Sequence, residues 1–236
     1  FAFLDNELKD AIFMLILLAL GLFLFGVKVF FEAEPGNPTV YFPFGVVKDL
    51  MVAHHVNIVR VPQDLINTYY SWPAFHFMNI SILEISGIAS SSFLDFIKYM
   101  PLHFLLSFVF ILYSVGKRFK LAPNRCFLLC FLAISSWMPD FAGFYYPRSY
   151  AMILFLLLFL LLIVPRRTTA MTIAAVLLYS TAVMMHGLVA LALIPGIFFL
   201  GVYRKDFRII ALFVVILFTW LVYLAPIVLE SGVDQL

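Results

Sequence analysis

Charged residues are scarce in this chain, since Asp, Glu, Lys and Arg make up 12% of its 236 residues and 64% are hydrophobic. The mean hydropathy is +1.07, and several apolar runs are long enough to cross a bilayer, which excludes a soluble globular domain. Backbone groups in hydrocarbon must be hydrogen-bonded internally, and these runs do not alternate in polarity, so we expect helices instead of barrel strands. The sequence therefore predicts an all-α, polytopic helical membrane protein.

Cysteine is almost as rare, with only Cys126 and Cys130, which are one helical turn apart. Cysteines at that spacing on one helix do not readily form a disulfide, and no metal-binding side chains accompany them. We expect both to pack in the interior. The small net charge of +2 comes from basic clusters beside apolar runs, so nothing indicates nucleic acid as a partner.

The middles of the apolar runs lack Asp, Glu, Lys and Arg altogether. Proton relays and ion-coupled transporters usually place an ionisable residue or a broken helix near the bilayer midplane, so this absence argues against both classes. His103, near the end of one run, is expected to form a hydrogen bond between packed helices.

About seven transmembrane helices are predicted within a single domain, residues 1–236. They lie near residues 11–29, 99–115, 126–138, 149–164, 169–186, 187–203 and 209–229. Residues 169–203 form one apolar run that would be roughly 50 Å long as a single helix, well beyond a ~30 Å hydrocarbon core. We therefore expect this run to break at Met185–Gly187.

Basic residues predict the orientation of these helices. With a cytoplasmic N-terminus, the cytoplasmic connections hold Lys117, Arg118, Lys120, Arg125, Arg166, Arg167, Arg204, Lys205 and Arg208. The short outer connections then hold Arg148 alone, as the positive-inside rule requires. We expect a multi-pass protein of the cell membrane. Because the chain begins at Phe1, we also expect it to be a processed protein or a piece of a longer one.

The long first outer loop, residues 31–98, is predicted to carry interfacial helices near residues 45–59 and 74–88. Polar residues from separate connections gather on the same outer side: Glu32, Glu34, Asp140, Arg148 and His186. Taken singly, such residues anchor helix ends at an interface. Taken together, they form a candidate site of the kind that performs group transfer.

The chemistry of these residue types suggests their roles. A carboxylate is suited to act as general base on an acceptor hydroxyl, and an arginine binds phosphate through two parallel hydrogen bonds. His186 and Asp140 would complete the polar side of the site. Tyr69, Trp72 and Tyr146 either stack on a sugar or belong to the aromatic belt of the membrane interface. No metal site is predicted, and a divalent cation is the one cofactor considered.

Three segments resemble the archaeal-type GT-C superfamily of membrane glycosyltransferases. YYSWPAFHFMNISILEISGIASSSFLDFIKYMPL resembles the segment before that family's second span, FYYPRSYAMILFLLLFLLL its aromatic-Pro-Gln-Ser motif, and MMHGLVALALI its histidine-containing outer turn. Their order and spacing agree with the family over roughly residues 10–230. Arg148 stands where the family motif has Gln, and Glu32 and Glu34 flank Ala33 where the family has Asp.

The resemblance implies an enzyme that transfers a sugar from a polyprenyl-phosphate donor to an acceptor on the outer face. By position, Glu32 or Glu34 would be the base, Arg148 would contact the lipid phosphate, and His186 would be the outer-turn histidine. The chain would be the N-terminal membrane part of such a glycosyltransferase or a relative that has lost catalysis. The alternative is a non-catalytic accessory subunit of a larger membrane complex, with partner membrane subunits docked on the outer loop.

Overall fold

The structure is a computed structural model that describes residues 5–26, 45–48, 50–51, 73–88, 92–136, 147–164, 168–205 and 207–233. Its helices are α1 (Asn6–Gly21) with a π-helical turn (Leu22–Gly26), α5 (Pro73–Ser86), α6 (Phe93–Arg118), α7 (Pro123–Ser136), α9 (Pro147–Leu162), α10 (Thr169–Met185), α11 (Gly187–Arg204) and α12 (Phe207–Val233). These ranges contain no strand, so the predicted all-α class is confirmed.

The ends of the helices follow local signals in the sequence. Asp5 caps α1 by accepting a hydrogen bond from the Leu8 amide at 2.8 Å, and Thr168 caps α10 in the same way through Met171. Proline, which is favoured in the first turn, begins α5, α7 and α9. Each cap satisfies amide protons that have no partner inside the helix.

Three helices test the boundaries that the sequence predicts. α10 ends at Met185 and α11 begins at Gly187, so the helix is interrupted at the expected position. α6 begins at Phe93, earlier than the predicted start near residue 99, because Phe93 and Ile97 are buried and join its first turns to the core. A hydropathy window locates apolar segments but does not detect such amphipathic ends.

α6 is the one described helix that has both the length and the hydropathy needed to cross a membrane. α7, α9 and α10 are apolar but shorter, as are the stretches Val189–Val202 of α11 and Ile210–Val222 of α12. Many side chains on the outside of the bundle are apolar, and Phe23, Ile85, Phe199 and Val222 are each more than 70% exposed. An apolar surface of this extent is typical of contact with lipid or with other proteins.

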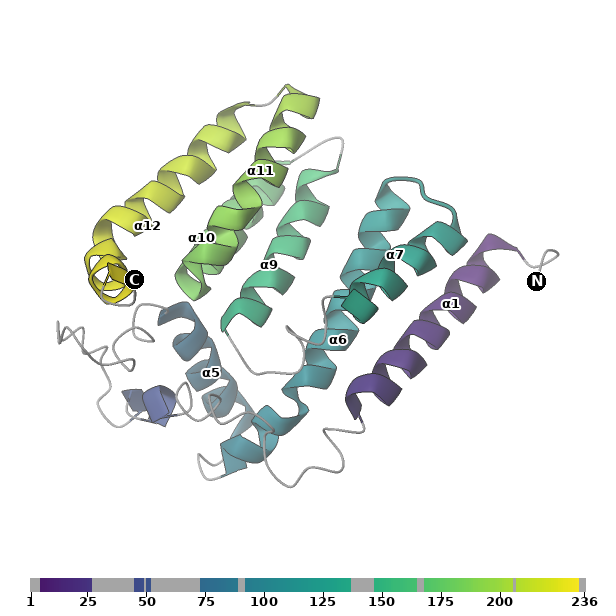
Figure 1. Ribbon diagram of the computed structural model, residues 1–236, viewed down its shortest axis with the longest axis horizontal. Coiled ribbons are helices and arrows are strands. Elements are labelled where there is room, and N and C mark those ends of the chain that lie inside the picture. Colours follow the sequence, from purple (N-terminus) through teal and green to yellow (C-terminus); the bar gives the residue numbers. More distant parts are fainter. Residues whose placement is uncertain are drawn as a thin grey trace.

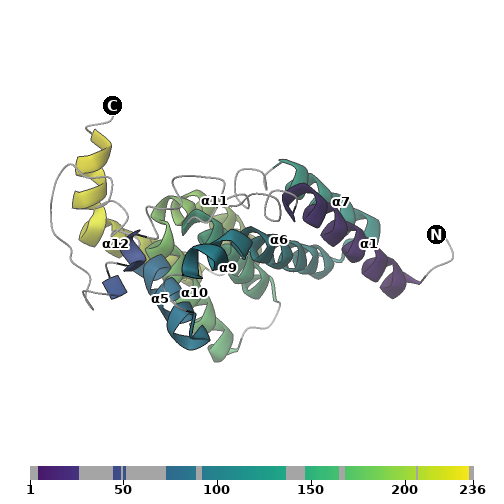
Figure 2. The same ribbon diagram turned by 90° about the horizontal axis from the view of Figure 1, so that it is seen from below.

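α9 lies at the centre of the molecule, between two hydrophobic clusters (Figure 1). Its first turns, with Tyr150 and Ala151, belong to a cluster shared with α1, α5, α6 and α7. Its last turns, with Leu158 and Leu162, belong to a second cluster shared with α10, α11 and α12. Figure 2 shows α1 and α7 on one side of the molecule and α12 on the other.

α1 and α6 approach each other closely at Gly21. A Cβ atom at this position would overlap the Leu105 side chain, so only glycine fits without a shift of that side chain. Nearer the start of α1, Asp10 accepts hydrogen bonds from the Tyr113 hydroxyl at 2.5 Å and from Lys117 Nζ at 2.6 Å. This ion pair and the close packing hold the two helices together.

Both cysteines are buried and free, as the sequence predicts for packing residues. Cys126 on α7 faces Gly116 on α6, where a Cβ atom would lie 2.9 Å from the Cys126 sulfur. Small residues at such contacts allow two helix backbones to approach each other.

Candidate functional site

Two of the predicted site residues, Arg148 and His186, lie in the part of the chain that the structure describes. The remaining predicted site residues lie outside the described residues: Glu32, Glu34, Tyr69, Trp72, Asp140 and Tyr146. Within the described residues, the candidate site consists of Arg148, His186 and the side chains that pack around them.

Arg148 occupies the first turn of α9. Pro147 begins this helix, and both Pro147 and Ser149 are buried while Arg148 is half-buried. The first turn of a helix has amide protons that point out along its axis and carry partial positive charge. The Arg148 guanidinium adds a full positive charge at the same place, so this end of α9 favours an anion.

His186 joins α10 to α11 and caps both helices. Its backbone is extended, its amide donates to the Ala182 carbonyl at 2.9 Å, and its Nδ1 accepts a hydrogen bond from the Val189 amide at 3.4 Å. A neutral imidazole that accepts through Nδ1 carries its proton on Nε2. His186 is thus held in one orientation, with Nε2 as the nitrogen that carries the proton.

Arg148 and His186 interact electrostatically although they are far apart in the sequence. Burial of the imidazole, and secondarily the positive charge of Arg148, lower the pKa of His186 from its ordinary 6.5 to about 4. His186 is therefore neutral at pH 7. The structure brings these two predicted residues together, at the junction of α9, α10 and α11.

Aromatic rings pack beside this junction. Tyr150 lies two residues after Arg148, and its ring meets the edges of Phe104 on α6 and Phe75 on α5, with centroids 4.4 and 5.6 Å apart. The Tyr150 hydroxyl donates to the Met100 sulfur at 3.0 Å. Tyr150 thus joins the first turn of α9 to α5 and α6, and no sequence pattern distinguishes it from neighbouring aromatic residues.

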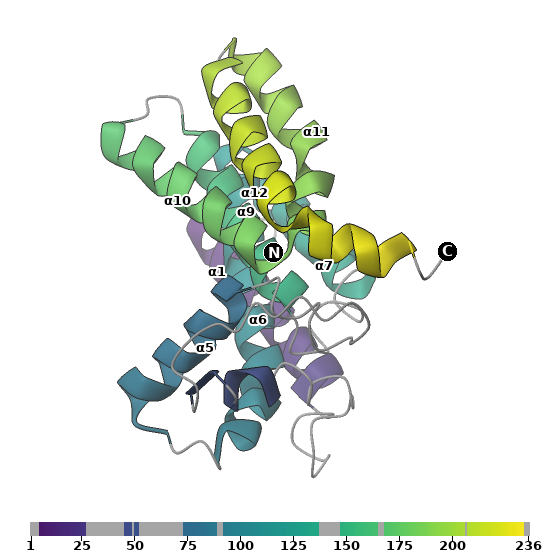
Figure 3. The same ribbon diagram turned by 90° about the vertical axis from the view of Figure 1, so that its left-hand side faces the viewer.

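α5 contributes two further polar residues that are completely buried, His76 and Asn79. Figures 1 and 3 both show α5 beside the end of α10 that leads to His186. The sequence did not single out these residues. A pattern in the sequence could have identified Asn79. It is the polar residue of a four-residue repeat, with Phe75 and Leu83, that lies on one face of α5.

The chemistry of the Arg148–His186 pair is that of two hydrogen-bond donors. A guanidinium offers only N–H groups, and the Nε2–H of His186 also donates. A ligand that satisfies both must supply acceptors, and an anionic oxygen satisfies them best. No group of three or more His, Cys, Asp or Glu side chains is suited to hold a metal ion within the described ranges.

His103 was expected to join helices through a hydrogen bond, and this prediction is wrong. The side chain is exposed on α6 and forms no hydrogen bond to any described residue. The side of α6 that carries Phe104 and Leu105 packs inward, which turns His103 outward.

Comparisons of the chain with protein-family models, with curated proteins and with solved structures found no match in any of the three.

Proposed function

We propose that this protein is a GT-C-like integral membrane glycosyltransferase that binds a polyprenyl-phosphate-linked sugar. The observation that carries the proposal is the meeting of Arg148 and His186 at the first turn of α9. The pair combines a guanidinium with a neutral imidazole whose Nε2 carries the proton, and both groups donate hydrogen bonds of the kind that bind an oxyanion.

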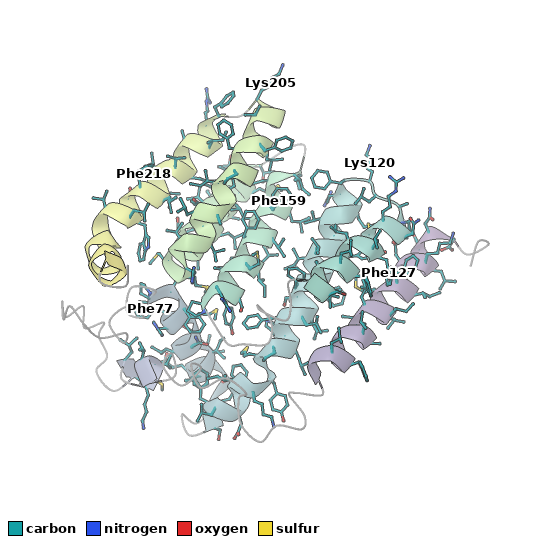
Figure 4. The ribbon with its side chains drawn as sticks, in the orientation of Figure 1. Phe77, Lys120, Phe127, Phe159, Lys205 and Phe218 are labelled. Atoms are coloured by element: carbon teal, nitrogen blue, oxygen red, sulfur yellow. The ribbon has the colours of Figure 1, made fainter. Side chains whose placement is uncertain are left out.

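Seven membrane spans, with the N-terminus in the cytoplasm, are part of this proposal. Its support is the direction of the helices: α1, α7, α10 and α12 run toward one end of the bundle, and α6, α9 and α11 run back (Figure 1). Lys120 and Lys205 both project at the end remote from Phe77 of α5 (Figure 4). The positive-inside rule places that end in the cytoplasm and the Arg148–His186 pair outside.

In the proposed reaction the acceptor hydroxyl oxygen attacks the anomeric carbon of the sugar, and the bond from that carbon to the phosphate oxygen breaks. Glu32 or Glu34 takes the proton of the hydroxyl as general base. Arg148 and His186 donate hydrogen bonds to the departing phosphate, on which negative charge builds up. The lipid chain of the donor remains in the bilayer throughout.

Binding of a lipid phosphate is the first test. The protein would be reconstituted in lipid nanodiscs and titrated with farnesyl phosphate and, as the uncharged control, farnesol. Replacing Arg148→Ala should weaken binding of farnesyl phosphate about 10- to 100-fold, because a charge-assisted hydrogen bond contributes roughly 1.5–3 kcal/mol. The matched control Arg125→Ala removes an exposed arginine from α7 and should have no effect.

Two results would contradict the proposal. One is equal affinity for farnesol and farnesyl phosphate, and the other is unchanged binding in Arg148→Ala. Native mass spectrometry of the protein extracted from its own membrane distinguishes the alternative function. Stoichiometric partner subunits without a bound polyprenyl-phosphate lipid would identify a non-catalytic accessory subunit.

A further inference from the structure

Asn79 lies on the inner side of α5, among apolar neighbours. Phe75, Asn79 and Leu83 follow one another at four-residue spacing and are 0%, 0% and 2% exposed. Residues at this spacing share one face of a helix. The middle member of an otherwise apolar stripe is therefore a carboxamide, which is costly to bury unless both of its ends are hydrogen-bonded.

Only one end of this carboxamide has a partner among the described residues. Asn79 Nδ2 donates to the Phe75 carbonyl of the same helix at 2.7 Å, while Oδ1 accepts no hydrogen bond from any of them. The orientation of the amide is set by chemistry, because a carbonyl oxygen must face the N–H end. Asn79 Oδ1 is therefore a buried hydrogen-bond acceptor that no described residue uses.

α5, which carries this acceptor, packs against the helices that carry Arg148 and precede His186. Phe75, one helical turn before Asn79 on the same face, contacts Tyr150, which follows Arg148 by two residues. α5 also packs against α10, the helix whose C-terminal end His186 caps. The side-chain view shows Phe77, next to this stripe, at the end of α5 that lies near α10 (Figure 4).

We propose that Asn79 recognises the sugar of the lipid-linked donor through a hydrogen bond, an inference that rests on the proposed function. Its Oδ1 would accept a hydrogen bond from a sugar hydroxyl while Arg148 binds the phosphate. The two sites differ in what they can recognise, because Arg148 needs an acceptor and Asn79 Oδ1 needs a donor. A polyprenyl phosphate dianion has no donor, so Asn79 selects phosphate esters that carry hydroxyl groups.

The test compares two lipids and three proteins in nanodiscs. The lipids are farnesyl phosphate and its mannosyl phosphodiester. The wild-type protein should bind the mannosyl lipid more tightly than the bare phosphate. Asn79→Leu should weaken binding of the mannosyl lipid about tenfold and leave farnesyl phosphate within twofold, whereas Ser81→Leu, on the exposed side of α5, should change neither.

Thermal unfolding of the same proteins separates recognition from packing. Leucine has the same number and branching of side-chain heavy atoms as asparagine and needs no hydrogen bond, so Asn79→Leu should unfold at the same temperature as the wild type or higher. Lower thermal stability together with equal weakening of both lipids would make Asn79 a packing residue and overturn the inference. Asn79→Ala provides a second variant if Asn79→Leu does not fold.

The outcomes also distinguish the two proposals. If the wild type binds neither lipid, the proposed function fails and the role of Asn79 fails with it. If the wild type binds both lipids equally, or if Asn79→Leu keeps the preference for the mannosyl lipid, Arg148 still binds phosphate and only the role of Asn79 is overturned.

Discussion

Arg148 and His186 interact electrostatically, yet they repel each other little because only Arg148 is charged at pH 7. The imidazole is neutral at pH 7 because burial and the neighbouring guanidinium lower its pKa to about 4. An oxyanion bound between them would counteract the effect of Arg148, since a nearby negative charge raises the pKa of an imidazole. The pair therefore combines one permanent cation with a donor whose charge depends on the ligand.

His186 should make the stability of the protein depend on pH over a defined window. Its pKa is 6.5 in the unfolded chain and about 4 in the folded protein, so between these values the unfolded chain binds the extra proton. The contribution of His186 to stability is complete above pH 6.5 and declines as the pH falls toward 4, by at most about 1.4 kcal/mol per pH unit.

The measurement is thermal unfolding of detergent-solubilised protein from pH 8 to pH 4. His186→Asn keeps a side chain that can cap α11 but does not titrate, so its unfolding temperature should fall less steeply than that of the wild type over this window. The difference between the two proteins isolates His186 from carboxylates that titrate in the same range. Parallel curves for the two proteins would show that His186 does not titrate as described.

At the scale of helices, the packing of α1 on α6 depends on the absence of a side chain at Gly21. Gly21→Val should place methyl groups where Leu105 lies and should destabilise the protein by about 1–3 kcal/mol, the usual cost of overpacking a core. Ala19→Val makes a similar change on the exposed side of α1.

Thermal unfolding of both variants in one detergent tests this prediction. Ala19→Val should unfold close to the wild-type temperature, because its added methyl groups meet no other helix. If Gly21→Val unfolds no earlier than Ala19→Val, α1 does not approach α6 as closely as the structure indicates. The ion pair of Asp10 with Lys117 should remain in both variants, since it lies nearer the start of α1.

At the scale of the whole molecule, the two ends of the bundle should face different aqueous compartments. Glu84→Cys on α5 and Lys120→Cys after α6 place exposed thiols at opposite ends. Alanine at Cys126 and Cys130 removes the native thiols. An impermeant maleimide added to intact cells should label Glu84→Cys, and Lys120→Cys should be labelled only after the membrane is permeabilised.

Two labelling results would contradict the predicted orientation of the bundle. Labelling of Lys120→Cys alone in intact cells would invert the orientation and place the Arg148–His186 pair in the cytoplasm. Equal labelling of both thiols in intact cells would mean that the bundle does not separate two compartments. Either result would remove the reason to assign the lipid phosphate to the outer face.

Local features of the sequence determined the helical class and the positions of the helices. Hydropathy, proline at first turns and capping residues act within a few residues of one another, so they can be read from a single segment. This is why residues 74–88 were predicted to be helical, why the run around His186 was expected to break, and why Cys126 and Cys130 were expected to be buried.

Only the tertiary structure decided which residues meet. Arg148 and His186 were both selected from the sequence, but their electrostatic contact depends on the packing of α9 against α10. Asn79 was not selected because its burial depends on the packing of α5, and His103 was assigned wrongly because the inward side of α6 is set by the helices around it. Contacts between distant segments arise from the packing of whole helices, which no local pattern specifies.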